Sequence, residues 1–259
     1  MPLEALIFDV DGTLADTEQD GHRVAFNAAF AEHGLDWHWD LALYGKLLQV
    51  AGGVERMAHY ARAHRALALD DATLSALLAR LHATKTRHYV QRVSGGAVPL
   101  RPGIERLIRE ARHQGLRLAI ATTTTRDNVV ALLEATLGAE APGWFEVMGT
   151  AQDVASKKPD PAVYRWVLER LRLDAGAAIA FEDSGHGVTA ATSAGLRCIV
   201  TPTDDSVADD LAAACVRLAD LDHHPDDAGR PVTLDDVRRW HALPRRRPAA
   251  TSAARADAA

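Results

Sequence analysis

The chain has 259 residues, of which 47% are hydrophobic and 25% are charged, and its formal net charge is −6. This composition predicts a globular protein with a sizeable core, and the negative charge argues against a broad nucleic-acid-binding face. The two cysteines form no pattern for disulfides or zinc, and no signal peptide or apolar run of 18 residues occurs, so we expect a cytoplasmic protein with no membrane partner.

The first predicted strand spans residues 5–8 and leads directly into two carboxylates, Asp9 and Asp11. Like charges this close repel each other, and each costs free energy to remove from water. A surface turn is one interpretation of this stretch, because Asp11-Gly12 is a common turn dipeptide. A functional site is the other interpretation, and the rest of the chain has to decide between them.

Residues 17–95 show the apolar spacing of helices and no convincing strand. Leu74, Leu77, Leu78 and Leu81, for example, recur at the spacing that 3.6 residues per turn requires. We therefore predict a small helical domain that is inserted after the first strand, and we call residues 17–95 the helical insert.

From residue 96 onward, short apolar runs alternate with helical patterns. The predicted strands cover residues 116–121, 145–148, 177–181 and 196–200, and the predicted helices cover residues 104–114, 128–137, 161–171 and 188–194. Such alternation is typical of an α/β fold with a doubly wound, Rossmann-like parallel sheet that helices cover on both faces. Ligands of such sheets bind beyond the carboxyl ends of the strands.

The predicted organisation has a core domain, formed by residues 1–16 and 96–224, and the helical insert, residues 17–95. Residues 225–259 are predicted to form a disordered tail, because their Ala/Ser-rich end contains almost nothing large to bury. The arginine run 245–247 in this tail is interpreted as solvated rather than as a recognition site.

Polar residues follow the predicted strands at the points where these strands end, and together they form a set: Asp9, Asp11, Thr122, Lys158, Glu182 and Asp183. Because parallel strands end at a common edge of the sheet, we expect these side chains to converge. An aspartate is ionised at neutral pH, so it needs no base to act as a nucleophile. A divalent cation together with a lysine offsets the charge of the phosphate that it approaches, so the set predicts phosphoryl transfer.

The chemistry of these residues suggests their roles. Asp9 and Asp183 supply the oxygen ligands that Mg²⁺ prefers, and Lys158 supplies a point charge for phosphate. Thr122 supplies a hydroxyl donor. Asp11, two residues from Asp9, is placed to protonate a leaving oxygen and then to activate water.

These residues resemble the four motifs of the haloacid dehalogenase superfamily of phosphohydrolases, which occur here in the same order as Asp9-Val10-Asp11-Gly12-Thr13, Thr122, Lys158-Pro159 and Glu182-Asp183. Further stretches resemble the CbbY branch, which is similar to β-phosphoglucomutase: residues 16–18, 21–23, 44–48, 52–53, 55–56 and 157–161. The resemblance covers about residues 3–220. It implies a Mg²⁺-dependent phosphatase for sugar bisphosphates that inhibit Rubisco, notably xylulose 1,5-bisphosphate.

The resemblance also implies the role of each residue. Asp9 would be the nucleophile that forms an aspartyl-phosphate, and Asp11 would be the general acid and base. Mg²⁺ would be bound by Asp9, the backbone carbonyl of Asp11 and Asp183. Glu182 would not bind Mg²⁺ itself but would lie next to these ligands. The helical insert would be the cap that closes over the core domain.

Substrate choice is expected to lie in the helical insert, because a cap supplies groups that the core lacks. Glu18 and His22 lie four residues apart on one predicted helix face, and the resemblance implies that they face the sugar. The alternative is a surface pair on an amphipathic helix. The resemblance also implies that Gly53 and Thr123 bind substrate.

One position departs from the CbbY pattern, because Val54 stands where that branch usually has a lysine. That lysine is expected to hold the second phosphate, and its loss would lower affinity about 10- to 100-fold. Either Lys46, Arg56 or Arg126 takes over this role, or the substrate is not the usual bisphosphate.

Two other enzymatic functions stay open. One is a phosphomutase of the β-phosphoglucomutase type, which would use the same aspartyl-phosphate, and the other is a phosphatase for a sugar monophosphate. A catalytically silent binding module is disfavoured, because Asp9 and Asp11 are both present. We expect a monomer whose partner is a small phosphorylated sugar.

Overall fold

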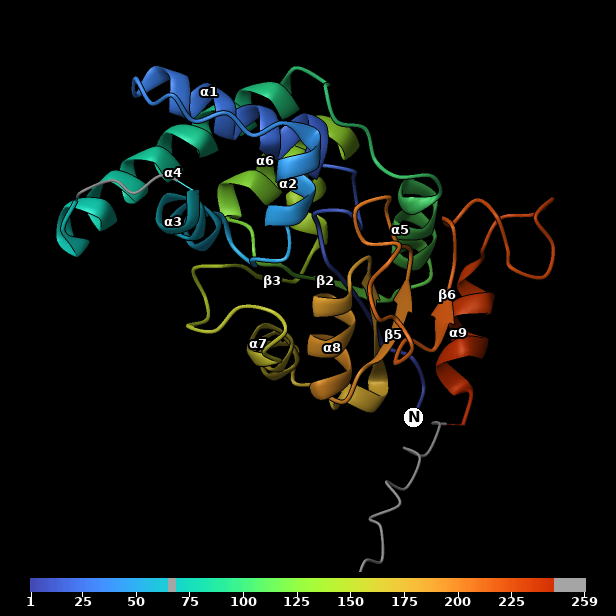
Figure 1. Cartoon of the computed structure of the whole chain (residues 1–259). Helices are drawn as coiled ribbons and strands as arrows, with labels where there is room; N and C mark the ends of the chain where they lie inside the picture. Colours follow the sequence, from blue (N-terminus) through green and yellow to red (C-terminus); the bar gives the residue numbers. More distant parts are fainter. Residues whose placement is uncertain (65–68, 245–259) are drawn as a thin grey trace, which may run out of the picture.

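The computed structural model describes residues 1–64 and 69–244 and is centred on a six-stranded sheet in the order β3-β2-β1-β4-β5-β6 (Figure 1). Every strand pair is parallel. The strands are β1 (Ala5–Phe8), β2 (Arg117–Ala121), β3 (Val147–Gly149), β4 (Ala178–Glu182), β5 (Arg197–Val200) and β6 (Val216–Arg217). In this part of the chain, no helix is both long enough and apolar enough to span a membrane.

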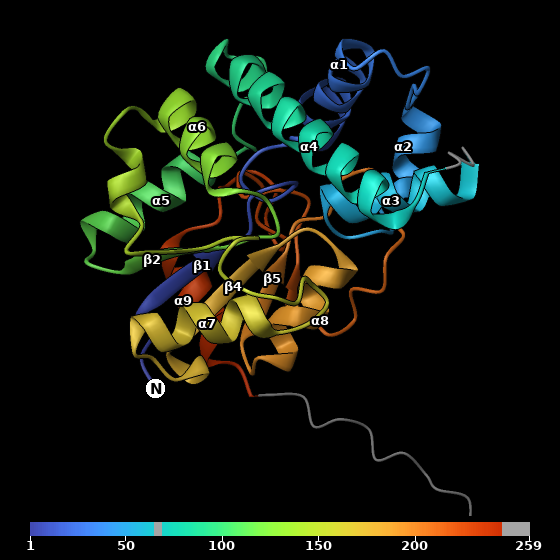
Figure 2. The ribbon, with the colours of Figure 1, turned by 90° about the vertical axis from the view of Figure 1, so that its left-hand side faces the viewer.

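Helices cover both faces of the sheet (Figure 2). One face carries α5 (Ile104–His113), α6 (Arg126–Leu137) and α9 (Leu234–Ala242), and the other carries α7 (Ala162–Leu171) and α8 (Gly185–Ser193). Leu6 and Phe8 of β1 pack toward the first group of helices, whereas Ala5 and Ile7 pack toward the second. This two-sided burial confirms the doubly wound α/β fold that the alternating pattern predicts.

The chain between β1 and α5 is helical, and its helices gather on one side of the sheet (Figure 1). They are the π-helix η1 (Glu18–Arg23), α1 (Val24–Glu32), α2 (Leu41–Leu47), α3 (Gly53–His64) and α4 (Asp71–Ser94). They bury an apolar cluster of their own, in which Trp37 and Trp39 contact Phe30 and Tyr60. Both tryptophans thus hold the helical insert together, while its role as a separate cap stays a prediction.

Element boundaries differ from the predicted ones by a few residues. Strand β3 begins at Val147 rather than at residue 145, and α8 begins at Gly185 because the Ser184 side chain accepts a hydrogen bond from the backbone N–H of Gly187. Two short 3₁₀ turns, η2 (Ala141–Trp144) and η3 (Ala175–Ala177), and strand β6 were not expected. Such short segments carry too few residues for a periodic signal.

The prediction of a disordered tail from residue 225 is wrong for residues 225–244. Helix α9 lies in this segment, and Val232, Leu234 and Val237 are fully buried in the main core. The arginine run 245–247 and the rest of the predicted tail lie outside the described residues.

A buried carboxylate, Asp236, fixes this C-terminal segment. The Asp236 side chain accepts hydrogen bonds from the backbone N–H and hydroxyl of Thr233 at 2.9 and 2.8 Å, which cap α9. It also pairs with Arg230 at 2.7 Å and with Arg239. Since Asp236 is fully buried, these partners compensate a charge that would otherwise be costly.

Replacing Asp236 by Asn is expected to lower the free energy of unfolding by about 2–3 kcal/mol, because the amide loses charge-assisted hydrogen bonds and leaves two arginines without their partner. Urea denaturation measures this loss. The matched control is Asp235→Asn, one residue earlier in α9, whose side chain is 81% exposed and whose substitution should change stability by less than about 0.5 kcal/mol. Equal losses of unfolding free energy in both variants would show that the buried contacts of Asp236 do not stabilise the protein more than an exposed aspartate does.

Candidate active site

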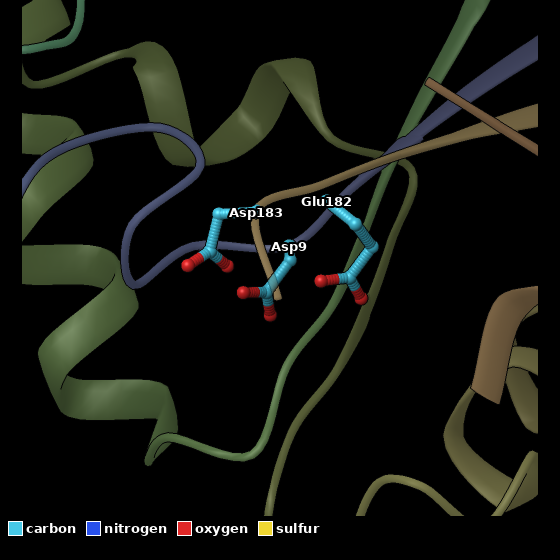
Figure 3. Close-up of side chains that lie close together, drawn as sticks. All are labelled: Asp9, Glu182 and Asp183. Carbon is cyan, nitrogen blue, oxygen red and sulfur yellow. The ribbon is translucent and has the colours of Figure 1, made fainter. Parts of the chain in front are cut away.

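The carboxyl ends of the strands bring the predicted catalytic residues together. Asp9 follows β1, Thr122 follows β2, and Asp183 follows β4. Figure 3 shows the side chains of Asp9, Glu182 and Asp183 next to one another. A first cavity, of about 120 Å³, is lined by all five residues predicted to be catalytic or to bind the metal: Asp9, Asp11, Thr122, Lys158 and Asp183.

Lys158 links two of the carboxylates behind this cavity. Its buried ammonium donates to Oδ1 of Asp9 at 2.7 Å and to Oε1 of Glu182 at 2.6 Å. The Tyr164 hydroxyl donates to the same oxygen of Glu182. Burial opposes the charge on Lys158, but Asp9 and Glu182 outweigh it and raise the pKa of this lysine. Glu182 therefore lies where it can orient Lys158 beside Asp9.

The carboxylates fit a divalent cation. Asp9, Glu182 and Asp183 each offer an oxygen, and these three atoms lie within 4.8 Å of one another. Burial raises the pKa of Asp9 to about 7, although Lys158 opposes this rise. Burial and the charges of Asp9 and Glu182 raise the pKa of Asp183 well above its usual range. A single lysine does not neutralise three buried carboxylates, so a bound cation would complete the charge balance.

The backbone at Gly12 makes this cluster possible. Gly12 adopts a φ of +83°, which side chains other than glycine rarely allow. A Cβ atom at this position would also collide with the carboxylate of Asp183. None of the ion pairs formed by the described residues involves Asp183, and the Ser206 hydroxyl lies 3.4 Å from its Oδ2. The Asp183 carboxylate is thus left available at the cavity.

Asp11 is held by residues of the helical insert. Its Oδ1 accepts a hydrogen bond from the Thr17 hydroxyl at 2.6 Å and lies 2.9 Å from Nε2 of His22. The other ring nitrogen of His22 lies 2.7 Å from the buried ammonium of Lys85. Burial acts to raise the pKa of Asp11, but His22 and Thr17 hold it well below its usual range. Burial also lowers the pKa of Lys85 to about 8, although Asp11 opposes this shift.

A second cavity, of about 300 Å³, adjoins the first. Asp11, Glu18, Gly52, Arg56 and Thr123 line both cavities, so these five residues form the boundary between the two spaces. The predicted residues His22 and Gly53 line the second cavity.

Glu18 belongs to a hydrogen-bonded group at the boundary of the two cavities. Tyr44 donates its hydroxyl proton to Glu18, and Arg56 lies 2.8 Å from the Tyr44 oxygen and 3.5 Å from Glu18. Because His22 is also buried, the alternative of a surface pair formed by Glu18 and His22 is wrong. Their contact with a sugar stays a prediction.

Two residues that were predicted to bind substrate lie elsewhere. Lys46 is exposed on α2, and Arg126 is exposed at the start of α6, where it donates to the carbonyl of Met148 at 2.9 Å. Neither lines the first or the second cavity. Of the three cations considered as replacements for the missing lysine at Val54, the structure brings only Arg56 to the cavities.

Lys85 and Lys157 line the second cavity but were not predicted as site residues, and neither was Tyr44, which bonds to Glu18 and Arg56. Lys85 carries a signal in the sequence, because it continues the buried face of α4 formed by Leu74, Leu78 and Leu81. A lysine on an apolar helix face is expected to have a buried partner. Tyr44 and Lys157 belong to stretches that resemble the CbbY branch, residues 44–48 and 157–161, but neither was assigned a role at the site.

Comparisons with known proteins identify the family of this chain. The family model of the haloacid dehalogenase-like hydrolases matches residues 3–195. The chain is 51% identical over 247 residues to the CbbY protein encoded on a plasmid of Cupriavidus necator, a match that covers 92% of this chain and 97% of the relative.

Solved structures are similar as well. A crystal structure of a mutant CbbY from Rhodobacter sphaeroides in complex with xylulose 1,5-bisphosphate has a TM-score of 0.78 and 44% identity, with 84% of this chain and 94% of that chain covered. A putative β-phosphoglucomutase from Thermotoga maritima has a TM-score of 0.60 and 28% identity, with 83% and 94% covered. The chain therefore belongs to the haloacid dehalogenase-like hydrolases, is similar to their CbbY members, and is a phosphoric monoester hydrolase.

Proposed function

We propose that this enzyme is a Mg²⁺-dependent phosphatase that hydrolyses xylulose 1,5-bisphosphate, and that it serves to remove this inhibitor of Rubisco. The observation that carries the proposal is the buried group of Asp9, Asp183 and Lys158, which line one cavity and would supply the nucleophile, ligands for the cation and an ammonium for the phosphate. The likeness to a CbbY structure with that sugar bisphosphate supports the choice of substrate.

In the proposed reaction, a carboxylate oxygen of Asp9 attacks phosphorus, and the bond from phosphorus to the sugar oxygen breaks. Asp11 gives a proton to that leaving oxygen and then takes one from the water that hydrolyses the aspartyl-phosphate. Lys158 binds an equatorial oxygen of the phosphate, and Thr122 offers its hydroxyl as a further donor. Mg²⁺, held by Asp9, Asp183 and the carbonyl of Asp11, would neutralise charge on the transferred phosphate.

The two adjoining cavities support a substrate with two polar ends. The first cavity offers the nucleophile and Lys158, and the second offers Lys85, Arg56 and Lys157 along its lining. A sugar bisphosphate carries two phosphates, and cations such as these form strong, charge-assisted hydrogen bonds to phosphate. We further propose that the enzyme acts as a cytoplasmic monomer.

Phosphate release from a panel of sugar phosphates tests this function. We expect the purified enzyme with Mg²⁺ to release phosphate from xylulose 1,5-bisphosphate faster than from ribulose 1,5-bisphosphate, glucose 1-phosphate or glucose 6-phosphate. Removal of divalent cations with EDTA is expected to abolish release, and added Mg²⁺ to restore it, because Asp9 and Asp183 would otherwise repel the substrate.

Each alternative has its own outcome in this assay. Conversion of β-glucose 1-phosphate to glucose 6-phosphate without free phosphate would identify a phosphomutase. Release from monophosphates in preference to the bisphosphate would identify a monophosphatase. Full activity in EDTA would exclude the proposed role of Mg²⁺.

A further inference from the structure

Two consecutive lysines, Lys157 and Lys158, line different cavities. Lys158 lines the first cavity and contacts Asp9, whereas Lys157 lines the second cavity and does not line the first. Two neighbouring residues therefore contribute one lysine to each cavity. Such an arrangement is suited to a ligand with two separated anionic groups.

In this structure Lys157 forms an ion pair with Glu55 of the helical insert. Its ammonium lies 2.5 Å from Oε2 of Glu55 in helix α3, so the pair joins the sheet domain to the insert. Gly52 leaves room for this pair, because a Cβ atom there would collide with both the Lys157 ammonium and the Glu55 carboxylate. Gly52 also has a φ of +93°, which favours glycine at this position.

The other cations at the second cavity have buried partners. The Arg56 side chain is 8% exposed and bonds to Tyr44 and Glu18, and the ammonium of the buried Lys85 contacts His22. Moving either cation would leave a buried polar group without its partner, which is costly.

Lys157 differs from those cations in its partner. The Glu55 side chain is 48% exposed, so water can solvate its carboxylate when Lys157 leaves. His82 does not compete for an anion at this cavity, because burial and the charges of Lys85 and Lys157 lower its pKa to about 4 and keep the imidazole neutral. Lys157 is thus the cation at the second cavity that a ligand can recruit with least loss.

We propose that Lys157 is a specificity-determining residue that leaves Glu55 and binds the second phosphate of a sugar bisphosphate while Lys158 holds the first. The proposal rests on the phosphatase function proposed above and names the residue that selects bisphosphates over monophosphates. It also accounts for Val54, since Lys157 lines the same cavity and supplies the charge that a lysine at position 54 would bring.

Two substitutions that break the same ion pair separate this role from a merely structural one. Lys157→Gln is expected to raise the KM for xylulose 1,5-bisphosphate about tenfold or more, with kcat changed less than about threefold and with no change for either corresponding monophosphate. Glu55→Gln is expected to lower the KM for the bisphosphate about threefold, because Lys157 no longer has to leave a partner. Steady-state kinetics with the bisphosphate and its two monophosphates measure both effects.

The control is Arg62→Gln in the same helix α3, which removes a positive charge whose side chain is 70% exposed and lines neither cavity. It should leave all KM values unchanged, and thermal denaturation verifies that every variant folds. If Lys157→Gln and Glu55→Gln change the KM in the same direction for all three sugars, the pair is only a bridge between insert and core, and the proposal is overturned. An unchanged bisphosphate KM in Lys157→Gln overturns it as well.

Binding measured without turnover keeps the proposal testable even if the proposed phosphatase function fails. Calorimetric titration of xylulose 1,5-bisphosphate into Asp9→Asn and into the double variant Asp9→Asn/Lys157→Gln is expected to give a Kd about tenfold higher for the double variant. Equal Kd values contradict the role of Lys157. A difference in Kd together with a wild type that releases no phosphate contradicts the phosphatase function instead.

Discussion

Replacing Asp9 by Asn is expected to reduce phosphate release to less than about 10⁻⁴ of the wild-type rate while leaving the protein folded. The amide has nearly the same shape as the carboxylate but is a poor nucleophile, so no aspartyl-phosphate forms. The substitution also removes one of three crowded carboxylates, and Lys158 keeps its hydrogen bond to Glu182 at 2.6 Å. We therefore expect a thermal midpoint within a few degrees of the wild type, measured alongside the rate.

Asp20→Asn is a suitable control for this experiment, because Asp20 is exposed in η1 and lines neither cavity. It should leave both rate and thermal midpoint unchanged. Phosphate release by Asp9→Asn at near the wild-type rate would refute the assignment of Asp9 as the nucleophile. A large drop in thermal midpoint would instead mean that the loss of activity reports on folding.

Most of the sheet could be predicted because its strands are buried on both faces. Residues 5–8 are all apolar, and residues 178–182 are apolar except at the last position, Glu182; such runs bounded by helical patterns are typical of parallel strands. Strand β6 has only two residues, one of them exposed, so no periodicity marks it. Helix α9 does carry a signal, a Thr233 cap three residues before Asp236, but the Ala/Ser-rich composition beyond it suggested disorder for the whole segment.

The convergence of the strand-end residues could be predicted from topology alone, since parallel strands that lie side by side end at one edge. Asp9 and Asp183 meet there because β1 and β4 are direct neighbours in the sheet. The contacts between insert and core depend instead on how helices pack over that edge. For this reason Lys157 and Tyr44 were missed, and Lys46 and Arg126, which are exposed outside the cavities, were included.

The contacts of Asp11 also could not be predicted from the spacing of Glu18 and His22 in the sequence. Glu18 and His22 were expected on one face of an α-helix, but η1 is a π-helix in which the His22 backbone N–H donates to the carbonyl of Thr17 at 2.7 Å. The wider turn changes which side chains share a face. It brings His22 to Asp11 and leaves Glu18 with Tyr44 and Arg56.

Replacing Asp11 by Asn is expected to lower kcat about 10²–10⁴-fold without a comparable loss of Mg²⁺ affinity. The Asp11 carboxylate contacts Thr17 and His22 rather than joining the acidic cluster of Asp9, Glu182 and Asp183, so the proposed metal site keeps its side-chain ligands, and the substitution preserves the backbone carbonyl. The amide neither protonates the leaving oxygen nor takes a proton from water, so both half-reactions slow down. Steady-state kinetics give kcat, and calorimetric titration gives the Kd for Mg²⁺.

The control is Asp16→Asn, an exposed aspartate of the same loop that lines neither cavity and should retain both values. A Mg²⁺ affinity that falls in parallel with kcat would place the Asp11 side chain in the metal site and contradict its role as acid and base.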